Sequence, residues 1–190
     1  MESSINRMNL VIKDTYYDYY PGFFPDTIFF PLFKELNDKC VKNASRFSCT
    51  FSNGAVGDSK SQLFSYSLIP SFTWESSTTI NMIKTVLENK LKTHFDYCLA
   101  HVYPDGTSHI PWHNDKEALK TDIVSVSFGA TRKFRFRQIG ETKGCCKEFY
   151  LNNGDFIHML EGCQKVFEHC VPVEKKVTNP RINLTFRKLE

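Results

Sequence analysis

The sequence predicts a mainly β protein, either a barrel or a double-sheet jelly roll, with helices packed on one side. After residue 94, polar and apolar residues alternate in seven short runs bounded by turn residues, a pattern typical of antiparallel strands. Helical periodicity is confined to two segments before that point. Because no internal repeat or low-complexity stretch divides the chain, we expect one domain over residues 1–190. Residues 1–94 would form helices and hairpins, and residues 95–190 the jelly-roll core.

The first helix is predicted over residues 27–39, where apolar residues recur at helical spacing and Asp26 could serve as the N-cap. Pro31 falls near its first turn, where the missing N–H is tolerated. Residues 40–76 read as hairpins with strands at 46–51 and 63–68. A second helix follows Ser77-Thr78-Thr79, and its apolar stripe is best explained by core packing.

Seven strands are expected after the second helix, each bounded by turn residues. Their predicted bounds are Tyr97–Tyr103, Ile123–Phe128, Lys133–Arg137, Lys147–Leu151, Asp155–Leu160, Val166–Val171 and Arg181–Arg187.

Composition narrows the function classes. The chain has 190 residues, of which 41% are hydrophobic and 14% aromatic, so disorder is excluded and a sizeable core is expected. A net charge of +3 neither demands nor excludes a polyanionic partner. No run approaches a membrane span or a signal peptide. Seven cysteines without a C-x-x-C pair indicate free thiols in a reducing compartment, and we expect an intracellular protein, in the nucleus, the cytoplasm or both.

The segment from His101 to Asp115 contains the pattern His113-x-Asp115. On an extended segment, side chains two residues apart point to the same side, so this imidazole and carboxylate can reach one cation. With a second imidazole they would form the 2-His-1-carboxylate set that holds non-haem Fe(II) and leaves positions open for a co-substrate and oxygen. The residues alone leave the third ligand open, because each remaining histidine could equally be hydrogen-bonded or on the surface. The candidates are His94, His101, His109, His158 and His169.

The last predicted strand alternates polar and apolar residues, so Arg181, Asn183, Thr185 and Arg187 share one face. Two guanidinium groups on a buried face require anions, and a dicarboxylate supplies two carboxylates that can each pair with an arginine. The alternative is a solvated face on an amphipathic strand.

At this point the sequence resembles the AlkB family of Fe(II)/2-oxoglutarate dioxygenases, strongly over about residues 95–190 and more loosely over 15–94. The spacing of twelve residues between His169 and Arg181 is similar to the eukaryotic nucleic-acid repair branch. The shared motifs are Tyr103-x-Asp105-Gly106, His113-x-Asp115, Gly154-Asp155, Glu168-His169-x-Val171-Pro172 and Pro180-Arg181-x-Asn183-Leu184-Thr185-Phe186-Arg187.

The resemblance implies a double-stranded β-helix fold and a role for each matched residue. His113, Asp115 and His169 would bind iron. Arg181, helped by Tyr103 and Asn183, would bind the distal carboxylate of 2-oxoglutarate, and Arg187 would lie near the carboxylate that chelates the metal. Glu117 would contact the exocyclic amine of a flipped base, on which Tyr66, beside Phe64, would stack. One departure is His101, because the family usually has asparagine at that position.

The reaction implied by the resemblance is oxidative demethylation of N-alkylated bases of the 1-methyladenine or 3-methylcytosine type. It would use Fe(II), 2-oxoglutarate and O₂ and release succinate, CO₂ and formaldehyde. The partner would be alkylated DNA or RNA with the target nucleotide flipped or single-stranded, and we expect a monomer that does not associate with membranes. Lys133, Arg135 and Arg137 share a strand face and could contact phosphates, or could form a solvated basic edge.

Two alternatives come from other classes. One is a 2-oxoglutarate-dependent oxygenase that acts on a protein or a small molecule. The other is a catalytically silent jelly-roll binding module, which the complete set of ligands and both arginines argue against.

Overall fold

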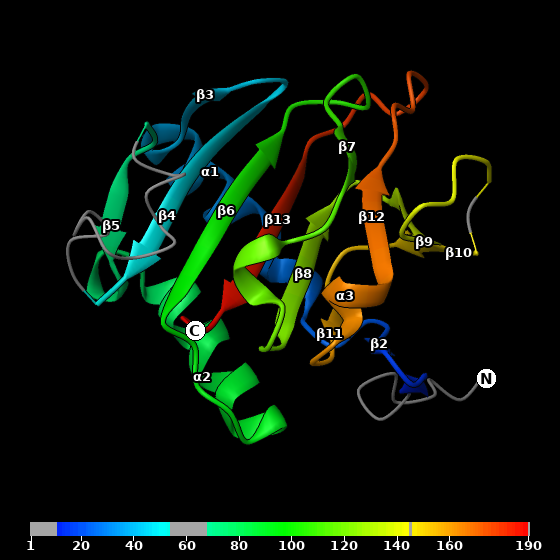
Figure 1. Ribbon diagram of the computed structural model, residues 1–190. Coiled ribbons are helices and arrows are strands. Elements are labelled where there is room, and N and C mark those ends of the chain that lie inside the picture. The colour runs from blue at the N-terminus through cyan, green and yellow to red at the C-terminus, as the bar shows by residue number, and fades with distance from the viewer. Residues whose placement is uncertain (1–10, 54–67, 145, 190) are drawn as a thin grey trace, which may run out of the picture.

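The computed structural model describes residues 11–53, 68–144 and 146–189. These residues form two mainly antiparallel sheets that face each other, with helices packed against the larger sheet (Figure 1). Within these residues the larger sheet has nine strands and the smaller sheet has four. The larger sheet runs β1 (Ile12–Lys13), β2 (Tyr17–Tyr20), β11 (Phe156–Met159), β8 (Ile123–Gly129), β13 (Arg181–Arg187), β6 (Tyr97–Tyr103), β4 (Arg46–Ser52) and β3 (Val41–Asn43), with β5 (Ser71–Thr73) parallel to β4. The smaller sheet runs β10 (Lys147–Leu151), β9 (Arg132–Gln138), β12 (Phe167–Val171) and β7 (Ile110–His113).

This architecture confirms the predicted mainly β jelly roll. Three predicted strands, β6, β10 and β13, have the observed bounds, and the other four differ by one residue at one or both ends. The predicted strand over residues 63–68 lies outside the described residues, apart from Leu68, which is in a turn. Several short elements were not predicted, among them β1, β3, β5 and the single-turn helix α3 (Cys163–Val166). The four-residue strand β7 was expected only as an extended segment, and it contains Pro111.

The helices α1 (Phe29–Lys39) and α2 (Thr78–Leu91) cover the outer face of the larger sheet. The predicted cap of α2 is present, since Ser77 Oγ accepts a hydrogen bond from Ile80 N at 3.1 Å. The predicted cap of α1 is wrong, because Asp26 begins a 3-10 turn (Asp26–Ile28) and the helix starts only after Ile28, without a side-chain cap. None of the described helices is both long and apolar enough to span a membrane.

Strand β13 lies between β8 and β6 in the middle of the larger sheet. Its apolar side chains face the core and its polar side chains face the opposite side of the sheet. Ile182, Leu184 and Phe186 are fully buried in the core shared with the helices. The intervening polar side chains therefore face the space between the two sheets, where Asn183, Thr185 and Arg187 line a cavity. The fold thus places the polar face of the last strand opposite β12 and β7.

The Gly154-Asp155 pair fastens the N-terminal strand to the jelly roll. Asp155 Oδ2 accepts a hydrogen bond from the Tyr19 hydroxyl at 2.6 Å, and Oδ1 accepts one from Gly22 N at 2.6 Å. Gly154 adopts φ +81°, and a Cβ at this position would lie 2.0 Å from the carbonyl oxygen of Phe24. Glycine is required both by the left-handed backbone and by the close approach of the Phe24 segment.

We expect Gly154→Ala to lower the free energy of unfolding by more than about 2 kcal/mol. The added Cβ would collide with backbone atoms of Phe24, which cannot move aside without a shift of the whole Phe24 segment. Gly140→Ala is the matched control. Gly140 also has a positive φ, +90°, but its added Cβ would meet nothing within 4 Å, so only the backbone strain of about 1 kcal/mol applies. Urea denaturation of both variants measures the difference. Equal losses of unfolding free energy in the two variants would show that the collision with Phe24 does not affect stability.

Candidate metal centre

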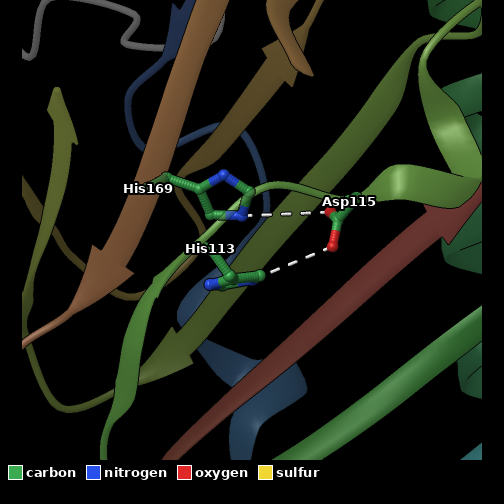
Figure 2. Close-up of side chains that lie close together, drawn as sticks. All are labelled: His113, Asp115 and His169. Atoms are coloured by element: carbon green, nitrogen blue, oxygen red, sulfur yellow. Dashed lines mark ion pairs between the residues drawn. The ribbon is translucent and has the colours of Figure 1, made fainter. Parts of the chain in front are cut away.

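Two imidazoles and a carboxylate converge at the edge of the smaller sheet. His113 ends β7 and His169 lies on β12, and the two are paired residues of neighbouring antiparallel strands (Figures 1 and 2). Asp115 follows two residues after His113. Its Oδ1 lies 3.8 Å from His113 Nε2, and its Oδ2 lies 3.9 Å from His169 Nε2. One ligand atom from each residue falls within 4.8 Å of the others, so the three can surround one metal ion.

Neighbouring groups orient these ligands. His113 Nδ1 lies 2.9 Å from the carbonyl oxygen of Pro111, which can only accept, so Nδ1 carries a proton and Nε2 is the nitrogen turned toward Asp115. The backbone N–H of Asp115 donates to Gln164 Oε1 at 3.0 Å. The ring of His169 stacks on Phe134 with centroids 5.3 Å apart. The ligands are therefore held in place by the protein itself.

The electrostatic surroundings give Asp115 and His169 the protonation states that a metal needs. Burial lowers the pKa of His169 to about 3, so its imidazole is neutral at neutral pH. Burial alone would raise the pKa of Asp115, but the positive charge of Arg187 outweighs that effect, and the pKa is lowered. Arg187 Nη2 lies 2.9 Å from Asp115 Oδ2. A charged carboxylate and a neutral imidazole result.

A cavity of about 200 Å³ opens beside the three ligands, between the sheets. Side chains of β4, β6 and β13 complete its wall: Arg46, His101, Tyr103, Asn183, Thr185 and Arg187. Next to it, the guanidinium of Arg181 lies 4.9 Å from the centroid of the Tyr103 ring. The cavity therefore has cationic side chains next to the metal ligands and beside Tyr103.

Arg181 is 1% exposed, and its hydrogen bonds are incomplete. Nη2 donates to Ser127 Oγ at 2.8 Å, but Nε and Nη1 make no hydrogen bond of ordinary geometry in the described part of the chain, and nor does the Tyr103 hydroxyl. Burial lowers the pKa of Arg181, while the nearby Tyr103 acts in the opposite direction. A buried guanidinium with two nitrogens of this kind, next to the Tyr103 ring, is suited to an anion, and a carboxylate has the matching geometry.

A family comparison explains this combination of metal ligands and arginines. Residues 56–187, more than two thirds of the chain, match the model of the 2OG-Fe(II) oxygenase superfamily. The chain belongs to this superfamily. The family uses Fe(II), 2-oxoglutarate and O₂, and the three ligands and the arginine-lined cavity fit the metal and a dicarboxylate.

Similar proteins confirm the resemblance to the AlkB family. DNA oxidative demethylase ALKBH2 of Bos taurus is 39% identical over 105 residues, which cover 50% of this chain and 37% of the relative. Alpha-ketoglutarate-dependent dioxygenase alkB homolog 3 of Bos taurus is 32% identical over 116 residues, covering 56% and 41%. The chain thus matches about two fifths of the length of these relatives. The solved structure of OsALKBH1 has a TM-score of 0.66 at 15% identity and covers 94% of this chain and 100% of that one, which shows the shared fold.

Among the remaining histidines, none of those described joins the metal ligands of this 2OG-Fe(II) oxygenase. His94 is exposed near Asp96, His109 Nδ1 contacts the carbonyl oxygen of Thr107, and His158 pairs with Asp122 at 2.6 Å. These contacts leave His169 as the partner of the His113-x-Asp115 pattern.

His101 is buried on β6 and lines the cavity. Its Nδ1 lies 2.7 Å from Ser48 Oγ. Burial, reinforced by Arg46, lowers its pKa well below the ordinary value, so the imidazole is neutral. His101 is therefore an uncharged polar residue of the cavity wall, and it does not belong to the group of metal ligands.

Asn183 and Glu117 are each engaged within the protein. Asn183 Nδ2 donates to Ser125 Oγ and to the carbonyl oxygen of Val126, at 2.8 and 2.9 Å. Glu117 lies in the 3-10 turn Lys116–Ala118, and its Oε1 accepts from Arg187 Nη1 at 3.0 Å. Arg187 thus joins Glu117 to Asp115. Phe64 and Tyr66, the predicted base contacts, lie outside the described residues.

Sequence patterns did not reveal Arg46, Ser48 or Gln164 as parts of the site. Arg46 and Ser48 reach it because β4 pairs with β6, a long-range contact with no local motif. The guanidinium of Arg46 donates to the carbonyl oxygen of His109 and lies 5.9 Å from the centroid of the Tyr103 ring. Alternation along β4 predicts which face of the strand carries Arg46, but not which neighbouring strand that side chain contacts.

The cations of β9 are paired with acidic residues on the outer face of the smaller sheet. Arg135 and Lys133 contact Glu148 on β10, and Arg137 Nη2 lies 2.8 Å from Glu168 Oε2 on β12. Cross-strand pairs of this kind offset the positive charge of Lys133, Arg135 and Arg137. The structure therefore favours a charge-compensated sheet face over a phosphate-binding strip.

Proposed function

We propose that this protein is an Fe(II)- and 2-oxoglutarate-dependent demethylase of N-alkylated bases in nucleic acid, of the 1-methyladenine or 3-methylcytosine type. The observation that carries the proposal is the convergence of His113, Asp115 and His169 beside a cavity with cationic walls. The match to the 2OG-Fe(II) oxygenase superfamily supports the use of the co-substrate, and the similarity to a DNA oxidative demethylase supports the substrate class.

The side chains bind and orient the reactants. Bound Fe(II) would supply the oxygen chemistry, in which 2-oxoglutarate and O₂ give succinate and CO₂, and the oxidised N-methyl group leaves as formaldehyde. His113, Asp115 and His169 would hold the metal on one side, with two imidazole nitrogens and one carboxylate oxygen. Arg181 and Tyr103 offer buried donors to the distal carboxylate of the co-substrate.

Recognition of the base would begin with Glu117. A carboxylate is a hydrogen-bond acceptor, and the exocyclic amino groups of adenine and cytosine are donors. Pairing with Arg187 holds the Glu117 carboxylate next to Asp115, close to the metal centre. Stacking of the base on Tyr66 and Phe64 is part of the same proposal. Such a pocket requires a flipped or single-stranded nucleotide.

The test is turnover of a defined oligonucleotide. Protein purified without oxygen is given Fe(II), 2-oxoglutarate and O₂ with an oligonucleotide that carries 1-methyladenine or 3-methylcytosine, and the product is weighed by mass spectrometry. We expect loss of the methyl group with wild type, and no loss with His113→Ala. His94→Ala is the matched control, because His94 is an exposed histidine away from the site. This variant should keep full activity.

The second candidate is a 2-oxoglutarate-dependent oxygenase that acts on a protein or a small molecule. The pairing of the β9 cations with Glu148 and Glu168 favours it, because that face offers little net charge to phosphates. Succinate formed while the oligonucleotide stays unchanged would contradict the proposed substrate and point to this alternative. A monomeric state and an intracellular location remain predictions.

A further inference from the structure

Arg132, the first residue of β9, is 1% exposed and contacts two other segments. Its Nε lies 3.0 Å from Glu174 Oε2, and Nη1 donates to the carbonyl oxygen of Asp105 at 3.2 Å. Nη2 donates to the carbonyl oxygens of Ser108 and Pro172, at 2.9 and 2.7 Å. All three guanidinium nitrogens are therefore satisfied, in contrast to those of Arg181.

The segments that Arg132 joins are the two loops that connect the strands of the site. Residues 104–109 lead from Tyr103 to β7, which ends in His113, and residues 172–180 lead from the β12 strand of His169 to Arg181. The loops also bind each other, since Gly106 N donates to the carbonyl oxygen of Val177 at 2.7 Å and Gly106 O accepts from Glu174 N at 2.8 Å. Arg132 thus fixes the connections on which the metal ligands and the anion-binding residues both depend.

Arg132 also contacts the anion-binding residues directly. Its guanidinium carbon lies 5.8 Å from the centroid of the Tyr103 ring, and that of Arg181 lies 4.9 Å from the same centroid. Two buried cations against one ring repel each other, and the carboxylate of Glu174 offsets the charge of Arg132. Of these two buried arginines, Arg181 is the one without an ion pair to a carboxylate among the described residues. The half-buried Arg46, also near the Tyr103 ring, donates to the carbonyl oxygen of His109 instead. A carboxylate that enters the cavity would therefore pair with Arg181.

We propose that Arg132 is a positioning residue for the distal carboxylate of the co-substrate. It clamps both loops and the Tyr103 ring so that the donors of Tyr103 and Arg181 face one point. The inference rests on the proposed use of 2-oxoglutarate. Arginine is required because its planar fork reaches four acceptors at fixed angles, whereas the single ammonium of lysine cannot satisfy all of them.

The experiment compares two ligands that differ only at the distal end. 2-Oxopentanoate has the same chain as 2-oxoglutarate, with a methyl group in place of the distal carboxylate. Binding of each ligand is measured by calorimetry on protein loaded with Mn(II) under anaerobic conditions, so that no turnover occurs. We expect Arg132→Met and Arg132→Lys to weaken 2-oxoglutarate binding about tenfold, as is usual for residues that orient a ligand's partners. Binding of 2-oxopentanoate should change less than about twofold.

The matched control is Arg135→Met, on the same strand. Arg135 also forms an ion pair with a glutamate, but on the outer face of the smaller sheet. This variant should bind both ligands as wild type does. If Arg132→Met does not fold, Glu174→Gln weakens the same contact without changing side-chain shape, and should give a smaller loss, confined to 2-oxoglutarate.

The outcomes separate the inference from the function on which it rests. An equal loss for both ligands would mean that Arg132 only maintains the fold of the loops, and unchanged 2-oxoglutarate binding would mean that it does not act on the site. Either result overturns the inference alone. Failure of wild-type protein to prefer 2-oxoglutarate over 2-oxopentanoate would overturn the proposed co-substrate, and the inference with it.

Discussion

Replacement of His169 by alanine is expected to abolish turnover and to weaken Fe(II) binding at least about a hundredfold, because one of three ligands is lost. The metal-free protein should still fold. His169 is neutral without metal and lies against Phe134, so the substitution removes a buried ring and costs about 2 kcal/mol of unfolding free energy. Loss of metal binding and retention of the fold are therefore separable in this variant.

Metal titration and thermal denaturation measure these two effects. Wild-type protein should show a melting temperature that rises with Fe(II) or Mn(II) under anaerobic conditions, because the metal binds the folded state. His169→Ala should melt at one temperature whatever the metal concentration. His158→Ala is the matched control, since His158 is also a buried histidine near a carboxylate, Asp122, but belongs to no metal-ligand group. A metal-dependent shift in His169→Ala would contradict the assignment of His169 as a ligand.

The strands and the ligand pair could be predicted because their signals are local. Alternation in β13 directs Arg187 and Asn183 to one side whatever surrounds the strand, and the side-chain period of two brings His113 and Asp115 to one point. These relations depend on the backbone alone. The third ligand was different, since the residues alone left five histidines as candidates and only the resemblance to the AlkB family pointed to His169. The pairing of β7 with β12 then placed His169 opposite His113.

Features that depend on tertiary pairing could not be predicted in the same way. Asp26 was expected to cap α1 from its residue type, but the chain makes a 3-10 turn before the helix starts. The basic face of β9 was correctly expected from alternation, whereas its acidic partners Glu148 and Glu168 come from neighbouring strands. Arg132 shows the same limit. In the sequence it is one cation in a basic run, and only the folded chain surrounds it with Glu174 and three carbonyl oxygens.

Replacement of Arg181 by methionine is expected to weaken 2-oxoglutarate binding at least about a hundredfold, since a charged and buried hydrogen-bonding pair is lost. The same substitution should leave the free energy of unfolding of the ligand-free protein unchanged or raise it by about 1–3 kcal/mol. Arg181 is buried, and its Nε and Nη1 make no hydrogen bond of ordinary geometry within the described residues, while methionine has a similar length without a charge. The lost contact with Ser127 Oγ opposes this gain.

The two effects have opposite signs, and that opposition distinguishes a binding residue from a structural one. Urea denaturation without ligand gives the stability, and calorimetry of the Mn(II)-loaded protein gives the affinity for 2-oxoglutarate. Arg132→Met is the matched comparison, because Arg132 is equally buried but has a hydrogen bond at each of its three guanidinium nitrogens, so its removal should destabilise the ligand-free protein. A large loss of stability in Arg181→Met would mean that Arg181 already has its anion within the protein. In that case the Nε and Nη1 groups of Arg181 would no longer support the binding of a dicarboxylate.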